Sequence, residues 1–174
     1  DDAKVYGNAW VFDNAKVFED AEVFGIAEVC GDAVVYCDAK VFGNAQVYDN
    51  AKVSGNTQVY ENAKVYENAK VFEDAEVFGI AEVCGNTEIR GDAEIRGDAE
   101  IASNSDYILF KNWWSSGRHF TWTKSNNMWK VGCFYGTGEE LIKKAYKDSE
   151  KSGREYERVV KYVESILKDN NADV

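Results

Sequence analysis

Proline is absent from the 174 residues, and histidine occurs once, as His119. Average usage would give about nine prolines, so the absence indicates backbone committed to hydrogen-bonded ladders, to which proline cannot donate. We find no apolar run near the ~18 residues of a membrane span and no signal peptide. The four cysteines lack the spacing of a disulfide framework. Together these absences predict a cytoplasmic protein with free thiols.

Basic residues are also scarce, and unevenly so. Residues 1–106 hold 22 acidic and 8 basic side chains, whereas residues 107–174 hold 9 and 12. An acidic surface repels DNA and anionic membranes. The first region is therefore expected to bind neither nucleic acid nor membrane directly, and its charge favours either a basic protein partner or simply solubility.

What is present is a repeat of six residues. Val or Ile recurs at every sixth position from Val5 to Ile101, and a small residue follows four positions later, as in Val47-Tyr-Asp-Asn-Ala-Lys52. The stretch Ala-x-Val-x alternates with period two, so Ala and Val share one side of a short strand. The next two positions, Gly, Asp or Glu and then usually Asn or Asp, suit a tight corner. This pattern predicts a coil of parallel strands with Val and Ala inside.

An internal duplication sets the size of the coil. The segment Asn14–Gly31 recurs unchanged as Asn68–Gly85, an eighteen-residue block shifted by three coils. Across residues 1–106 the pattern resembles the hexapeptide-repeat proteins of bacteria and phages, including uncharacterised transferase-like members. The resemblance implies a left-handed parallel β-helix of about six triangular coils. The predicted fold class is therefore mainly β.

Residues 107–174 predict a second unit that covers the last coil. Three strands are expected at 107–113, 119–124 and 128–135, with a two-residue turn at Asn126-Asn127 between the last two. Two helices follow, with capping boxes expected at Thr137/Glu140 and Ser152/Glu155. The prediction is a small βββαα module capping the β-helix.

We expect no catalytic, cofactor or metal site. Acyltransferases of the resembled family use a histidine as general base, and zinc enzymes of the same fold use three; the repeat here contains none. We interpret His119 as a strand-end side chain without chemistry. Ile89-Arg-Gly-Asp92 resembles a coil motif of the zinc group, and without zinc ligands we interpret it as corner sequence.

The outward position after each Val is unusually aromatic. Sorting by coil places five rings on one face in an unbroken row, flanked by charges that we expect to pair along the ladder. One interpretation is that the rings only stack on one another for rigidity; the other is an interface. We expect the helices to cover the small sheet and leave the row free. The candidate interface is Tyr6, Phe24, Phe42, Tyr60 and Phe78 with Glu22 and Glu76.

Three functions follow from these features. The first is a non-catalytic binding or inhibitor-type module that presents a stiff, acidic, aromatic-striped β-helix to an unidentified protein partner. If phage-encoded, such a protein could act by analogy on a host nucleic-acid-handling or defence protein. The second is a self-assembling structural protein, a homo-oligomer. The third is an acyltransferase, which the missing repeat histidine disfavours.

Overall fold

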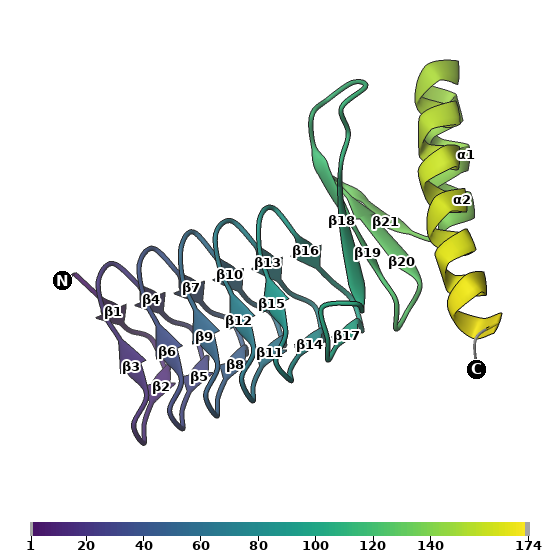
Figure 1. Ribbon diagram of the computed structural model, residues 1–174. Coiled ribbons are helices and arrows are strands. Elements are labelled where there is room, and N and C mark those ends of the chain that lie inside the picture. Colours follow the sequence, from purple (N-terminus) through teal and green to yellow (C-terminus); the bar gives the residue numbers. More distant parts are fainter. Residues whose placement is uncertain (1, 173–174) are drawn as a thin grey trace.

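The computed structural model describes residues 2–172, with side chains through residue 169. A three-sided prism of short parallel strands leads into an antiparallel sheet and a pair of helices (Figure 1). Residues 1 and 173–174, the outer limits of the two predicted units, lie outside the described residues. Seventeen two-residue strands, three to a coil, make five complete coils and two strands of a sixth. The predicted triangular coil of parallel strands is confirmed, and the left-handed winding stays a prediction.

Each side of the prism is one parallel sheet. The first sheet consists of β1 (Lys4–Val5), β4 (Glu22–Val23), β7 (Lys40–Val41), β10 (Gln58–Val59), β13 (Glu76–Val77) and β16 (Glu94–Ile95). The second consists of β2 (Trp10–Val11), β5 (Glu28–Val29), β8 (Gln46–Val47), β11 (Lys64–Val65), β14 (Glu82–Val83) and β17 (Glu100–Ile101). The third consists of β3 (Lys16–Val17), β6 (Val34–Val35), β9 (Lys52–Val53), β12 (Lys70–Val71) and β15 (Glu88–Ile89).

The interior is the predicted set of small and branched side chains. From Ala21 to Ile101 the inward Ala, Val and Ile residues have no exposed surface. Neighbouring strands pair in register eighteen residues apart, as Val41 does with Val59, so each Val stacks on the Val of the next coil. The six-residue period thus positions every outward side chain as well as every inward one.

The corners use the left-handed region at the first of their two positions. Nine glycines occupy such corners, and seven other residues do so with φ between 57° and 66°: Asp13, Glu19, Cys37, Asp49, Glu61, Glu67 and Glu73. This conformation is disfavoured for residues with a Cβ. Five of the corner carboxylates offset it by accepting the backbone N–H of the corner one coil later, as Glu67 Oε2 does from Gly85 at 2.7 Å.

The second unit contains four strands, not three: β18 (Tyr107–Lys111), β19 (His119–Thr123), β20 (Met128–Val131) and β21 (Phe134–Gly136). The predicted third strand was wrong because Gly132, at φ 53°, opens a two-residue turn that pairs Val131 with Phe134. The predicted Asn126-Asn127 turn was also too short. Residues 124–127 form it, and Asn126 Oδ1 accepts from both Thr123 Oγ1 and the Met128 N–H.

Helix α1 (Gly138–Asp148) begins at the predicted capping box of Thr137 and Glu140. Helix α2 (Glu150–Ala172) begins earlier than predicted, because Ser149, not Ser152, receives an N–H bond, from Ser152 at 3.1 Å. Both helices pack on the sheet, as expected. Their buried residues join Trp114, Phe120, Trp122 and Trp129 in one core, separate from that of the prism.

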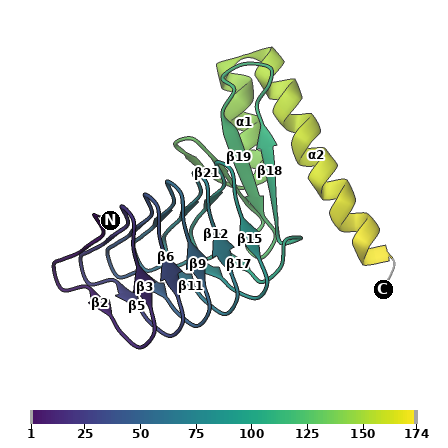
Figure 2. The same cartoon turned by 60° about the vertical axis from the view of Figure 1, so that its left-hand side comes forward.

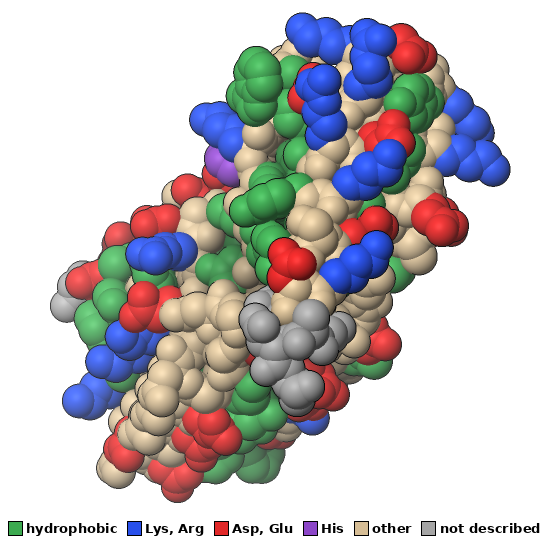
Figure 3. Space-filling view, turned by 45° about the vertical axis from the view of Figure 1, so that its right-hand side comes forward, with side chains coloured by type: hydrophobic (Ala, Val, Ile, Leu, Met, Phe, Trp, Pro, Cys, Tyr) green, Lys and Arg blue, Asp and Glu red, His purple; other side chains and the backbone are tan. Residues whose placement is uncertain are grey.

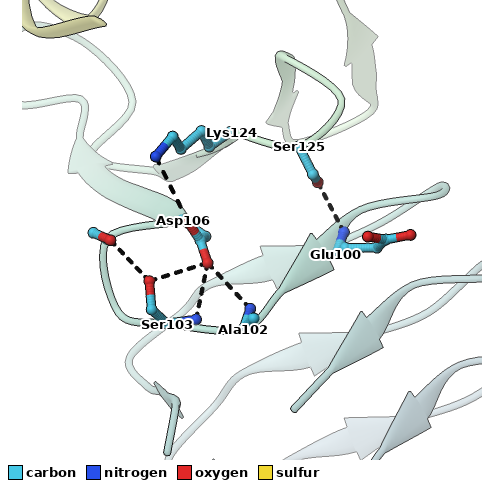
Figure 4. Close-up of polar contacts among 7 residues, drawn as sticks. Glu100, Ala102, Ser103, Asp106, Lys124 and Ser125 are labelled. Carbon is cyan, nitrogen blue, oxygen red and sulfur yellow. Dashed lines mark hydrogen bonds and ion pairs between the residues drawn. The ribbon is translucent and has the colours of Figure 1, made fainter. Parts of the chain in front are cut away.

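The antiparallel sheet closes the last coil (Figure 2). In the prism, the first residue of each strand donates its N–H to a carbonyl of the next coil. At the last coil, side-chain oxygens accept instead: Asn104 Oδ1 from Glu88, Thr121 Oγ1 from Glu94 and Ser125 Oγ from Glu100. The third of these bonds is drawn in Figure 4. One acceptor therefore terminates each of the three sheets.

A tight turn connects the two units. Asp106 Oδ2 accepts the N–H groups of Ala102 and Ser103 and the Ser103 hydroxyl at 2.8–3.1 Å (Figure 4). Its second oxygen faces Lys124 Nζ at 4.0 Å.

Among the described residues, neither helix is long and apolar enough to cross a bilayer.

Candidate interaction surface

The five predicted rings form a continuous stack on the first sheet, here called the aromatic ladder: Tyr6, Phe24, Phe42, Tyr60 and Phe78. Successive centroids lie 4.8–5.0 Å apart, and successive planes deviate by 1–5°. The strand spacing of a parallel sheet is nearly the same distance, so the backbone sets the stack. The structure therefore brings together every ring that the sequence placed in this row.

The ladder continues into the second unit through a cation. The Arg96 guanidinium lies 5.3 Å from the centroid of Phe78 and 5.2 Å from that of Tyr135 on β21. The Tyr135 hydroxyl donates to the Arg96 carbonyl at 3.2 Å. Arg96 follows Phe78 at the same position of the next coil, but nothing in the non-repeating region of the sequence indicated that Tyr135 would extend the row.

The two predicted carboxylates bind the ladder itself. Tyr6 Oη donates to Glu22 Oε2 at 3.0 Å, and Tyr60 Oη donates to Glu76 Oε2 at 3.1 Å. Burial and the nearby Glu76 charge raise the pKa of the Tyr60 phenol. The expected pairing of charges along this face was wrong: among the described residues, the ion pairs between coils are Lys64–Glu82 and Lys70–Glu88, on the other two faces.

Exposure along the ladder changes from one end to the other. Tyr6 is 47% exposed, Phe24, Phe42 and Tyr60 are half-buried, and Phe78 is 6% exposed beneath Arg96. The hydrophobic face of the helix pair packs against the antiparallel sheet and not against the ladder. The middle of the ladder therefore presents ring edges and carboxylates on the outside of the prism.

The other two faces carry shorter stacks. Tyr48 and Tyr66 stack at 4.9 Å on the second sheet, and Phe18 and Tyr36 stack at 5.3 Å on the third. Cysteines flank the first pair at 30 and 84, and all four cysteines of the chain are free. The ladder is thus the longest aromatic row on the prism.

His119 has a partner that sequence reasoning missed. Its Nδ1 lies 2.6 Å from Asp92 Oδ2, at the corner that ends the Ile89-Arg-Gly-Asp92 motif. Glu94 and Arg118 line the same opening between the last coil and the β18–β19 hairpin. The contact orients the imidazole and joins the two units. Only the docking of β19 on the coil brings these two residues together, so no sequence spacing could have indicated the pair.

Neither a metal-binding cluster in the part of the chain that the structure describes nor a whole-chain relative accompanies this surface. No cluster of three or more His, Cys, Asp or Glu residues suited to a metal occurs among the described residues. Residues 45–61, from the end of one coil into the next, match the family model described as YdcK Beta solenoid repeat. This likeness agrees with the β-solenoid fold of the prism. No curated protein and no solved structure matches the chain.

Proposed function

We propose that this protein is a non-catalytic interaction module that binds a basic protein partner through the aromatic ladder and its carboxylates. The observation that supports this most directly is the half-buried middle of the ladder, Phe24 to Tyr60, which the chain's own helices leave uncovered. Aromatic rings held rigidly supply contact area at little entropic cost, and such rings are enriched at interfaces.

Charge determines the class of partner. The prism region carries fourteen more acidic than basic side chains, and Figure 3 shows Lys and Arg gathering at the helix end of the molecule. Such a field attracts a cationic surface and speeds its association. The finer proposal is that the partner normally binds nucleic acid, because the surface of such a protein is built to recognise a polyanion.

The experiment compares two double substitutions that each remove one stacked pair. Phe42→Ser with Tyr60→Ser alters the ladder, and Tyr48→Ser with Tyr66→Ser alters the second sheet. Both proteins are immobilised and exposed to bacterial lysate. Basic proteins captured by the unaltered chain should be lost only with the ladder variant, and should elute with salt.

Light scattering on the same two variants tests the self-assembly alternative. A mass above the monomer that falls only in the ladder variant would assign the ladder to a second copy of the chain. Equal capture by both variants would contradict a role for the ladder in binding.

A second candidate function, acyl transfer, is favoured by the contact between Asp92 and His119. A carboxylate on Nδ1 fixes the tautomer that leaves Nε2 available as a general base. Incubation with acetyl-CoA and a panel of amines and sugars, with release of CoA followed by a thiol reagent, tests it. We expect no turnover; turnover abolished by both His119→Ala and Asp92→Asn would establish the enzyme.

A further inference from the structure

A pocket of about 280 Å³ lies in the second unit, away from the aromatic ladder. It is formed where the tip of the β18–β19 hairpin meets α1 and the first turns of α2. Its apolar lining comes from three elements: Val131 and Phe134 on β20 and β21, and Leu141 and Ala145 on α1. An apolar lining with a few converging polar groups is typical of small-ligand sites.

The rim of this pocket is held in place before any ligand arrives. Asn112 is 2% exposed, and its Oδ1 accepts from both the N–H and the hydroxyl of Ser115 at 3.0 and 3.1 Å. Its backbone N–H donates to the Arg118 carbonyl at 2.8 Å. The hairpin tip that carries Arg118 is therefore fixed at its base, which lowers the entropic cost of binding.

One buried hydroxyl is left with a hydrogen to donate. Tyr156 is 9% exposed and lines the pocket, and its oxygen accepts from Asn112 Nδ2 at 3.1 Å. Among the described residues no acceptor takes the hydrogen of this hydroxyl. Burial raises the pKa of Tyr156, while the Asn112 bond and the Arg118 charge oppose the rise. The phenol is a neutral donor close to a guanidinium.

The charges of the pocket favour an anion. Arg118 and Lys144 line it with one acid, Asp148, and neither cation has an ion-pair partner among the described residues. A second pocket of about 270 Å³, between the same sheet and helices, offers a contrast. Its charged lining residues are Glu139 and Glu164. Two pockets of similar size thus differ in the sign of their lining charge.

We propose that the pocket at Arg118, Lys144 and Tyr156 binds a terminal carboxylate carried on a small apolar body. The guanidinium and the phenol hydroxyl donate to the carboxylate, and the apolar lining takes the hydrocarbon. The same chemistry occurs in a free organic acid and in the C-terminal residue of a peptide. The volume suits a group the size of one amino-acid side chain with its carboxylate.

The experiment is an amide NMR titration of the full chain with 3-phenylpropionate. We expect saturable shifts at residues 115–118, 144–148 and 152–156, with a Kd of about 1 mM. The neutral 3-phenylpropionamide and the cationic 3-phenylpropylamine should leave these amides unchanged. A tetrapeptide ending in Phe, with a free or an amidated C-terminus, distinguishes the two sources of the carboxylate.

Matched variants decide which groups bind. Arg118→Gln should weaken the binding of 3-phenylpropionate about tenfold, because a charge-assisted hydrogen bond is lost. Tyr156→Phe should weaken it about threefold. Lys143→Gln, on the same helix and outside the pocket, should have no effect. Equal shifts with acid and amide, or equal affinity of the Arg118→Gln and Lys143→Gln proteins, would overturn the proposal, as would the absence of shifts at these amides. Arg118 is exposed, so its variant stays informative even if Tyr156→Phe fails to fold.

Discussion

The prism and the second unit are built on opposite principles. In the prism every strand contact joins residues eighteen apart, and the interior is made of small Ala, Val and Ile side chains in repeated layers. In the second unit the contacts have no fixed separation, as in the Asn112–Tyr156 bond across 44 residues. There a few large rings dominate the core. The prism therefore spreads its stability over many equal steps, and the second unit concentrates it.

Val53→Asp should have the largest effect. Val53 has no exposed surface, so the change places an unpaired charge in a dry interior and should cost more than about 4 kcal/mol of unfolding free energy. Thermal melting by circular dichroism measures it. Lys52→Asp, one residue earlier and exposed, should cost little. An unchanged melting temperature for Val53→Asp would contradict the interior assignment.

Trp129→Ala should unfold the second unit while the prism persists. Trp129 is 2% exposed and packs against Phe110 and Phe120, so its loss should cost about 3–5 kcal/mol. Hydrogen exchange should show lost protection in residues 107–169 and retained protection in the inner coils. Trp113→Ala, at a ring that is 78% exposed, is the control. Equal loss in both units would show that they fold as one.

Alkali should weaken the prism through its tyrosines. Burial first, and Glu76 second, raise the pKa of Tyr60 in the folded state. A raised folded pKa gives stability that is complete below the ordinary phenol pKa of about 10 and is lost as pH rises toward the folded value. Denaturant midpoints measured from pH 8 to 12 should fall above about pH 10. Tyr60→Phe keeps the ring in the stack and should fall less steeply.

Two corner glutamates allow the stabilising effect of a side-chain hydrogen bond to be measured against a matched control. Glu61 and Glu67 both occupy the left-handed region, at φ 60° and 57°, but only Glu67 is seen to accept the N–H of the next corner. Replacing each by Ala keeps the backbone penalty equal in the two variants. Glu67→Ala should therefore lose about 1 kcal/mol more than Glu61→Ala in urea unfolding. Equal losses would show that these bonds contribute nothing.

The smallest effect is expected at the Lys64–Glu82 pair. The hydrogen bond from Lys64 at 2.8 Å lowers the pKa of Glu82. The stability it supplies is therefore present above the ordinary Glu pKa of about 4.3 and is lost as pH falls through the lowered value. Because solvent reaches both side chains and screens the pair, Lys64→Gln should lower the denaturant midpoint only slightly at pH 7, and by less at pH 3. Lys52→Gln, whose partner in register is Lys70, serves as the control.

The sequence predicted the prism correctly and the second unit only in part. The interior residues, the coil of eighteen and the aromatic row followed from the period, since each contact repeats at a constant separation. The fourth strand did not, because Gly132 read as part of a continuous run from Met128 to Tyr135. The start of α2 was placed at Ser152 because Ser152 and Glu155 have the capping-box spacing and Ser149 does not. In the structure Gly153 lies inside the helix, close to the Tyr146 side chain of α1, a contact that no local pattern indicates.

By itself the sequence determined the prism: what faces in, what faces out, and where each ring of the ladder lies. It could do so because a strand in a repeat contacts only its copies, so the local pattern contains the three-dimensional one. The tertiary structure alone placed Tyr135 beyond Arg96, Asp92 against His119, and Tyr156 beside Arg118. These neighbours come from elements that meet only when the hairpin, the helices and the last coil pack together, and packing of unlike surfaces leaves no period in the chain.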